Sequence, residues 1–427
     1  MPIKKIMLAG ACSLAFLTTS FQQEATALPA YARQTGFSCT MCHFQRFPLL
    51  NPFGRSFKAN GYTLVGGKQG TVEDSNLSIP ASLNAAFVSK FKYQKRNGSA
   101  TTDATPEERD ISQQNAGQFQ APDEAILYVA GRVAKNIGFQ AEINLAGKVN
   151  LAGFKMPFVF PATDDLTFSV IPFITDSEGP AYGFELLNTG AIEFSRAFEH
   201  AEETSAQQYL GTALSSEGQG TTGVALVAYS KMGYLSFTPF IPKYPLNDNN
   251  TFSPNQFLSY VRGVVTPEKV GNFDLAAGFQ LWKGNSKTSH PAEPDNTHAD
   301  AWALDAQAQG KAGKYPLGVY LTYGNAAKTS TGGQPNIFND SFVANKTAWT
   351  VAADLGIIPS KLALGAAYRN AHSGAGGSDA ENAITLAVTY SPVKNVAFQL
   401  NQSFYSYDAS LSEEGNQHTT LVMYSAF

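Results

Sequence analysis

An alternation of apolar and polar residues with a period of two recurs along the chain from about residue 80 to its end. In one stretch, Leu275, Ala277 and Phe279 alternate with Asp274 and Gln280. Because successive side chains of a β-strand point to opposite faces, each stretch predicts a strand with one apolar and one polar face. The same pattern occurs within residues 83–94, 302–309, 317–323, 349–355, 384–390 and 396–403.

The length of these stretches and the polarity of their second face favour a membrane barrel over a soluble sandwich. Each stretch runs about 10 to 12 residues, close to the length that a tilted strand needs to cross a bilayer. Apolar residues would then face lipid, and polar residues would face a wet lumen. We therefore expect an all-β, transmembrane antiparallel barrel over residues 73–427. Aromatic residues near strand ends fit an interfacial girdle, namely Tyr93, Tyr234, Trp282, Trp302, Tyr315, Trp349 and Tyr390.

The connections between the stretches alternate in length, which is typical of bacterial outer-membrane barrels with short periplasmic turns and longer extracellular loops. We count about sixteen strands and expect a connection at 150–164. The fifth strand, near 184–195, has the weakest pattern, because its residues could equally start a helix or an inward-folded loop. Short links are expected near 266–272, 311–314, 356–360 and 391–395, and longer ones near 284–299, 326–345, 371–380 and 408–416.

Residues 1–27 have the pattern of a cleaved export signal. Lys4 and Lys5 precede a short apolar stretch, and Ala25 and Ala27 form an A-x-A cleavage site. The alternative, an uncleaved anchor helix, is disfavoured because the apolar stretch is short for a membrane span. We expect no transmembrane helix after residue 27, so the mature chain is either periplasmic or an outer-membrane barrel.

A C-x-x-C-H motif near the start of the mature chain predicts covalent attachment of one c-type haem. Cys39 and Cys42 supply two thiols for thioether bonds to the haem vinyl groups, and His43 is placed to ligate the iron. One alternative is a disulfide or thiol pair that happens to precede a histidine. A zinc site is disfavoured, because no second Cys/His pair with ligand spacing exists to complete a tetrahedron.

Residues 28–72 are expected to form a compact segment around this haem, in which phenylalanines and prolines are frequent. The segment is too short to bury a full core alone, so it needs the haem and the barrel. It enters from the periplasmic side, and we expect it to plug or cap the lumen, with the inside position favoured. Arg33, Arg46 and Arg55 could pair with the haem propionates or be solvated surface arginines.

The sixth ligand of the iron is left open by the sequence. The candidates are Met156, Met232, His200, His290, His298 and His372, or a vacant position.

One predicted extracellular loop gathers groups that could attract a cation. The alternative is a solvated polar loop. The residues are His290, Glu293, Asp295, His298 and Asp300.

Several motifs in the chain resemble the fused monohaem cytochrome–porins of the outer membrane, the family known from iron-oxidising bacteria. The resemblance implies one haem c, a barrel of about sixteen strands, and oxidation of extracellular Fe(II) with electrons passed to a periplasmic c-type cytochrome. The motifs are ARQTG at 32–36, CTMCH at 39–43, NPFGR at 51–55, NGYTL at 60–64, GPAYGFE at 179–185 and LNTG at 187–190.

Three functions are therefore compared. The first is electron transfer across the outer membrane, with the iron accepting an electron near the outer face of the lumen; it is an iron:cytochrome c oxidoreductase only if Fe(II) is the donor. The second is a diffusion porin whose haem is a structural plug. The third is a periplasmic haem enzyme, peroxidase-like. The formal charge of −4 does not favour binding to nucleic acid.

Overall fold

The computed structural model describes residues 29–64, 71–75, 78–81, 84–97, 117–147, 149–191, 198, 201–212, 220–243, 253–289, 296–377, 379–407 and 416–427. The predicted signal at 1–27 lies outside these residues. So do His200, His290, Glu293 and Asp295.

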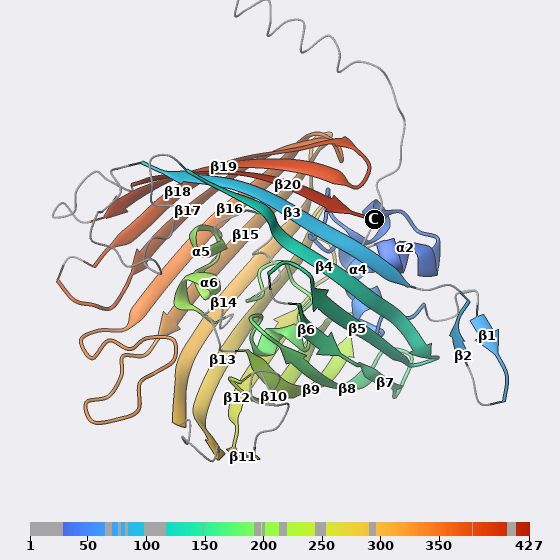
Figure 1. Ribbon diagram of the computed structural model, residues 1–427, viewed down its shortest axis with the longest axis horizontal. Helices are drawn as coiled ribbons and strands as arrows, with labels where there is room; N and C mark the ends of the chain where they lie inside the picture. Colours follow the sequence, from blue (N-terminus) through green and yellow to red (C-terminus); the bar gives the residue numbers. More distant parts are fainter. Residues whose placement is uncertain are drawn as a thin grey trace, which may run out of the picture.

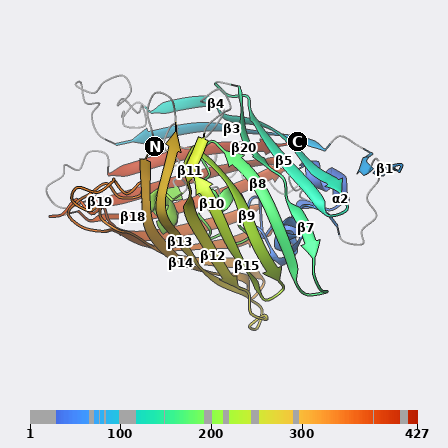
Figure 2. The same ribbon diagram turned by 90° about the horizontal axis from the view of Figure 1, so that it is seen from below.

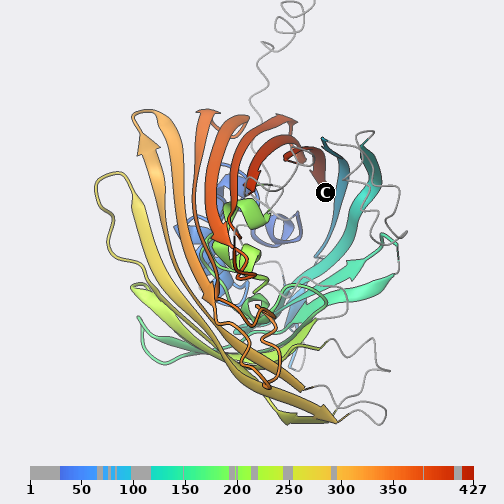
Figure 3. The ribbon, with the colours of Figure 1, turned by 90° about the vertical axis from the view of Figure 1, so that its left-hand side faces the viewer.

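The described strands close into one antiparallel barrel, which Figure 3 shows end-on. Eighteen segments, β3 to β20, follow one another around it. Two positions are each filled by two consecutive segments, because β6 and β7 both lie between β5 and β8, and β11 and β12 both lie next to β13. The barrel therefore has sixteen strands. Its bounds are β3 Ala85–Arg96, β4 Gln118–Ala134, β5 Ile137–Asn144, β6 Asn150–Lys155, β7 Phe158–Pro161, β8 Thr167–Thr175, β9 Thr221–Ser230, β10 Gly233–Ile241, β11 Ser253–Gln256, β12 Leu258–Val265, β13 Asp274–Ser289, β14 Asn296–Ala312, β15 Tyr315–Ala326, β16 Lys346–Ile358, β17 Leu362–His372, β18 Glu381–Val393, β19 Val396–Tyr407 and β20 Gln417–Ala426.

The predicted alternation of faces is confirmed along the strands. On β14, Trp302 and Leu304 are 39% and 50% exposed and point outward, whereas Asp305 and Gln307 are buried and point into the lumen. A band of outward apolar side chains surrounds the barrel in this way, including Leu226, Phe237, Phe279, Leu321, Trp349, Leu364, Leu386, Phe398, Leu400 and Leu421. Among the described residues, no helix is long and apolar enough to cross a membrane.

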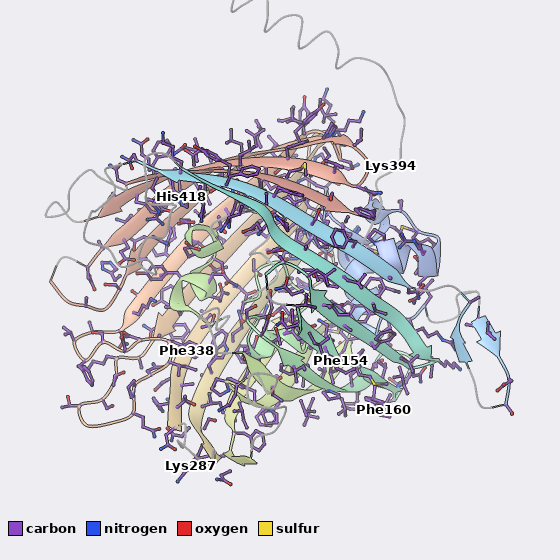
Figure 4. The ribbon with its side chains drawn as sticks, viewed as in Figure 1. Phe154, Phe160, Lys287, Phe338, Lys394 and His418 are labelled. Atoms are coloured by element: carbon purple, nitrogen blue, oxygen red, sulfur yellow. The ribbon has the colours of Figure 1, made fainter. Side chains whose placement is uncertain are left out.

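The two ends of the barrel differ in their connections. The tight-turn end carries short turns such as 135–136, 231–232, 313–314 and 394–395, and the start of β3 and the end of β20 also lie there. The opposite end, here called the loop end, carries the long connections. In Figure 4, Lys394 lies at the tight-turn end and Lys287 lies at the loop end.

Two of the predicted strand assignments are wrong. The stretch 150–164, expected as a connection, contains a strand made of β6 and β7, which is interrupted at Pro157 because proline lacks the donor for a ladder hydrogen bond. The stretch 184–195, expected as the fifth strand, has no strand among its described residues 184–191. The two errors offset each other, so the expected total of sixteen strands is confirmed.

Residues 176–191 and 201–212 instead fold into the lumen from the loop end. This inward segment contains the 3-10 helix η3 (Pro180–Tyr182) and the short helices α5 (Ala201–Thr204) and α6 (Ala206–Leu210). In Figure 3 the green helices of this segment lie inside the ring of strands.

The N-terminal residues 29–64 form three helices at the tight-turn end of the barrel. These are α2 (Pro29–Thr35), α3 (Cys39–Cys42) and α4 (Pro52–Ala59), drawn in blue in Figures 1 and 2. Helix α4 starts at Asn51, whose side-chain oxygen accepts a hydrogen bond from the backbone N–H of Gly54, and Pro52 occupies the first helical position, where no donor is needed. A hairpin of β1 (Thr71–Glu73) and β2 (Ser78–Pro80) follows.

We expect the substitution Leu321→Arg, on the outward face of β15, to destabilise the barrel by about 2–4 kcal/mol if that face contacts lipid. The matched control is Val343→Arg, because Val343 is an exposed apolar residue in the loop between β15 and β16. Unfolding by urea in lipid vesicles measures both variants. Equal effects of the two substitutions would contradict a lipid-facing band.

Candidate functional site

The C-x-x-C-H motif is held in one turn of helix and pinned to helix α4. Helix α3 places Cys39 and Cys42 one turn apart, and the N–H of His43 donates to the carbonyl of Cys39 at 2.8 Å. The side-chain amide of Asn51 donates to the carbonyls of Thr40, at 3.2 Å, and Met41, at 3.0 Å. Because the same side chain caps α4, Asn51 joins the motif to the helix that follows it.

Gly54 completes this connection. A side-chain carbon at position 54 would collide with the carbonyl oxygen of Cys42, so only glycine lets α4 approach the motif this closely. In the sequence, Asn51 and Gly54 stand out only as members of the NPFGR motif at 51–55. The structure adds their physical role, which is to fix the backbone of the motif.

Polar contacts seat the N-terminal segment against lumen-facing side chains. Arg46 forms an ion pair with Asp354, and Arg55 forms one with Asp274. The backbone N–H of Leu50 donates to the side chain of Asn188 at 2.7 Å, and the amide of Asn188 donates back to the carbonyl of Leu50 at 3.0 Å. Since Asp354 and Asp274 point into the barrel and Asn188 belongs to the inward segment, residues 29–64 lie within the lumen at the tight-turn end.

The three arginines considered as propionate partners make contacts with the barrel. Arg33 donates to the backbone carbonyl of Ala85 at 2.5 Å, and Arg46 and Arg55 bind the carboxylates of Asp354 and Asp274. Among the described residues, none of the three lines the cavity next to the motif. Their contacts join the N-terminal segment to the strands.

A cavity opens beside Cys42 and His43, between the N-terminal segment and the barrel wall. Its empty volume, including its mouth, is about 1020 Å³. The barrel wall contributes Tyr128, Gln140, Glu142 and Lys155 to the lining, and the inward segment contributes Glu178 and Tyr182.

The face of the cavity contributed by the N-terminal segment is aromatic. The rings of Tyr31 and Tyr62 stack with their centroids 4.8 Å apart, and Phe57 meets Tyr31 edge-on at 5.4 Å. Phe47 lies edge-on to the ring of His43 at 5.5 Å. Flat aromatic side chains around a histidine form a surface that suits an apolar macrocycle, so the residues present fit a haem attached to Cys39 and Cys42.

The surroundings of the two cysteines disfavour a thiolate. Burial raises the pKa of Cys39 to about 12 and the pKa of Cys42 to about 11, so both are neutral thiols at neutral pH. The thiolate is the form that binds metals and attacks disulfides. In the part of the chain that the structure describes, no group of three or more His, Cys, Asp or Glu side chains is placed to hold a metal ion.

The candidate distal ligands that the structure describes do not line the cavity. Arg55 of the N-terminal segment contacts Gln309 on β14, and His298 lies on the same strand. At about 3.3 Å per residue, His298 is about 36 Å from Gln309 and therefore far from the N-terminal segment. His372 pairs with Asp379 at the loop end. Met232 is 79% exposed in a turn, and Met156 follows β6 without reaching the cavity lining. His200 and His290 lie outside the described residues.

The loop residues considered as a cation site are partly committed to neighbours. Asp300 accepts a hydrogen bond from the ammonium of Lys283 at 2.6 Å, and Nδ1 of His298 is 2.9 Å from the side-chain oxygen of Asn285. Both residues lie on strand β14 and not in the loop expected near 284–299, and these contacts occupy their side chains.

A buried ion cluster that the sequence analysis did not predict anchors the inward segment to the wall. Arg262 on β12 is fully buried, and its guanidinium donates to both carboxylate oxygens of Asp305, at 2.5 and 2.8 Å, and to Glu185 at 2.9 Å. Glu185 also accepts the hydroxyl of Tyr234 at 2.8 Å, and Thr189 donates to Asp305. The cluster holds residues 185–189 against β10, β12 and β14.

Comparison with known proteins finds no matching family model and no matching curated protein. Among solved structures, the outer membrane channel DcaP of Acinetobacter baumannii is similar with a TM-score of 0.47 and 12% identity, over 81% of this chain and 97% of that chain. OmpF of Salmonella typhi is similar with a TM-score of 0.46 and 10% identity, over 84% of this chain and 100% of that chain. For OpdK of Pseudomonas aeruginosa the TM-score is 0.42 and the identity 11%, over 80% and 98%.

We expect Arg262→Met to release the inward segment and raise the ion conductance of the lumen. Removing the guanidinium leaves two buried carboxylates without their shared cation, a change that typically costs about 3–5 kcal/mol. Single-channel recording in planar bilayers measures the conductance. Lys283→Met, which breaks the exposed pair with Asp300, serves as the control; equal conductance in the two variants would show that the cluster does not hold the segment in place.

Proposed function

We propose that this protein lies in a bacterial outer membrane and transfers electrons across it through one c-type haem held in the lumen. The observation that carries the proposal is the position of Cys42 and His43 on the wall of an aromatic cavity inside a closed barrel. A redox group fixed there is separated from lipid by the strands and is reached from either side only through the lumen.

The outward apolar band supports the location. A closed barrel leaves no unpaired sheet edge, and its band of exposed leucine, phenylalanine and tryptophan side chains is stable only against an apolar medium. The same band disfavours the periplasmic haem enzyme, whose surface would face water.

Each residue of the site has a distinct task in this proposal. Cys39 and Cys42 tether the cofactor, and His43 ligates its iron from the N-terminal segment. Tyr31, Phe57 and the other aromatic side chains exclude water, and Asn51 keeps the backbone of the motif in place. The haem, when bound, gains and loses a single electron.

The position of the cavity changes the expected route of the electron donor. His43 was expected near the outer face of the lumen, but the structure places it at the tight-turn end. An external donor therefore has to pass the loop end and enter the lumen to reach the site. The resemblance suggests Fe(II) as this donor, and a periplasmic c-type cytochrome as the acceptor at the tight-turn end.

A diffusion porin is the second candidate. A closed barrel of sixteen strands is wide enough for an aqueous channel, which favours it. The N-terminal segment and the inward segment both occupy the lumen, so any diffusion is limited to the space between them and the wall. Electron transfer and diffusion therefore predict different behaviour in sealed vesicles.

The test uses the full-length protein reconstituted in vesicles that contain a trapped electron acceptor. We expect a covalently bound haem that is reduced by external Fe(II), and we expect Cys39→Ala with Cys42→Ala to remove both the haem and the electron transfer. Liposome swelling in sugar solutions measures diffusion in the same vesicles. Swelling without haem reduction by any external donor would favour the porin. Reduction by another donor but not by Fe(II) would exclude Fe(II) as the donor and leave the proposed electron transfer in place.

A further inference from the structure

The haem that the proposed function requires brings two propionate carboxylates into the cavity between the N-terminal segment and the barrel wall. A buried carboxylate is stable only when a cation or several hydrogen-bond donors face it. The three arginines of the N-terminal segment are directed to Ala85, Asp274 and Asp354 on the strands. None of these arginines lines the cavity, so other side chains are the cations closest to a propionate there.

Two cationic side chains line the cavity among the described residues, Lys58 on α4 and Lys155 on β6. They differ in burial. Lys58 is half-buried and remains in reach of water, whereas Lys155 is only 4% exposed. An ammonium group loses more hydration in the buried position, so a carboxylate ligand stabilises Lys155 more than Lys58.

The surroundings of Lys155 hold its ammonium at the cavity wall. The group donates to the backbone carbonyl of Tyr182 at 3.1 Å and lies 4.1 Å from the centre of the Tyr182 ring. These contacts fix the position of the charge. Because Tyr182 belongs to η3, the inward segment helps to orient a side chain of β6 toward the cavity.

Glu142, the carboxylate next to this region, has donors of its own. Its Oε1 accepts the hydroxyl of Tyr182 at 2.9 Å and the side-chain amide of Gln140 at 2.6 Å. Glu142 and Glu178 both line the cavity. Like charges repel, so among the charged groups of the lining only the lysines attract a propionate.

We propose that Lys155 binds a haem propionate, so that the barrel wall supplies part of the cofactor site. This inference rests on the proposed haem, and it assigns to the barrel a role beyond enclosure. The N-terminal segment tethers and ligates the haem, and β6 neutralises its charged edge. The electrostatic consequence is a higher reduction potential, because a positive charge near the iron favours the state with one more electron.

The test compares Lys155→Met and Lys155→Arg with the wild-type protein, and uses Lys231→Met as a control at an exposed turn on the same end of the barrel. Spectroelectrochemistry of the full-length protein in detergent measures the midpoint potential. We expect Lys155→Met to keep its covalent haem and to lower the reduction equilibrium constant about tenfold, equivalent to about 59 mV for one electron. Lys155→Arg and Lys231→Met should retain the wild-type potential.

Three results separate the possible failures. Wild-type protein without bound haem would end the proposed function and this inference together. Bound haem with the same potential in Lys155→Met and wild type would overturn the inference alone. A change to a high-spin spectrum in Lys155→Met alone would make Lys155 an axial ligand, which also overturns the inference.

If Lys155→Met does not fold, resonance Raman spectra of wild type and Lys155→Arg test the inference through the propionate-bending band. Identical bands in the two proteins would contradict direct binding of Lys155 to a propionate.

Discussion

The closure of β20 onto β3 is the constraint on which the rest of the structure depends. In hydrocarbon, every backbone N–H and C=O must find a partner within the protein, so a sheet that crosses a membrane cannot keep an open edge. The two strands pair from His418 opposite Arg96 to Ala426 opposite Val88, and this pairing completes the ring. Once the ring is closed, an interior exists that polar side chains can line and other segments can fill.

The interior of this barrel is organised by charge. Arg46 and Arg55 attach the N-terminal segment to strand carboxylates, whereas the carboxylate of Glu185 attaches the inward segment to Arg262 of β12. Such pairs are costly to bury, and in the most buried of them the guanidinium of Arg262 is bound by two carboxylates. The two segments also meet each other, where Asn188 exchanges hydrogen bonds with the backbone of Leu50. The cavity beside His43 is therefore bounded by three parts of one connected structure.

The sequence predicts the barrel well where strands are long and regular. From β13 to β20, the alternation of faces and the short and long connections determine the architecture, because lipid on one side and water on the other leave a strong periodic pattern. Prediction fails where that pattern is interrupted. Pro157 divides one strand into β6 and β7, and the buried polar residues Glu185, Asn188 and Thr189 follow no period because they bind particular partners in the lumen. The motif at Cys39 is recognisable from spacing alone. The wall side of its cavity is not, since a single lysine in a strand, such as Lys155, carries no signal until the fold brings it next to the motif.

The division of the cavity between two parts of the chain has a consequence for biogenesis. Cys39 and His43 belong to the N-terminal segment, whereas Tyr128, Gln140 and Lys155 are on strands that follow much later in the sequence. In the proposed function, an enzyme that attaches haem would reach the cysteines only while the strands are still open around them. Haem attachment would then precede closure of the barrel, and the strands would fold around a segment that already carries its cofactor.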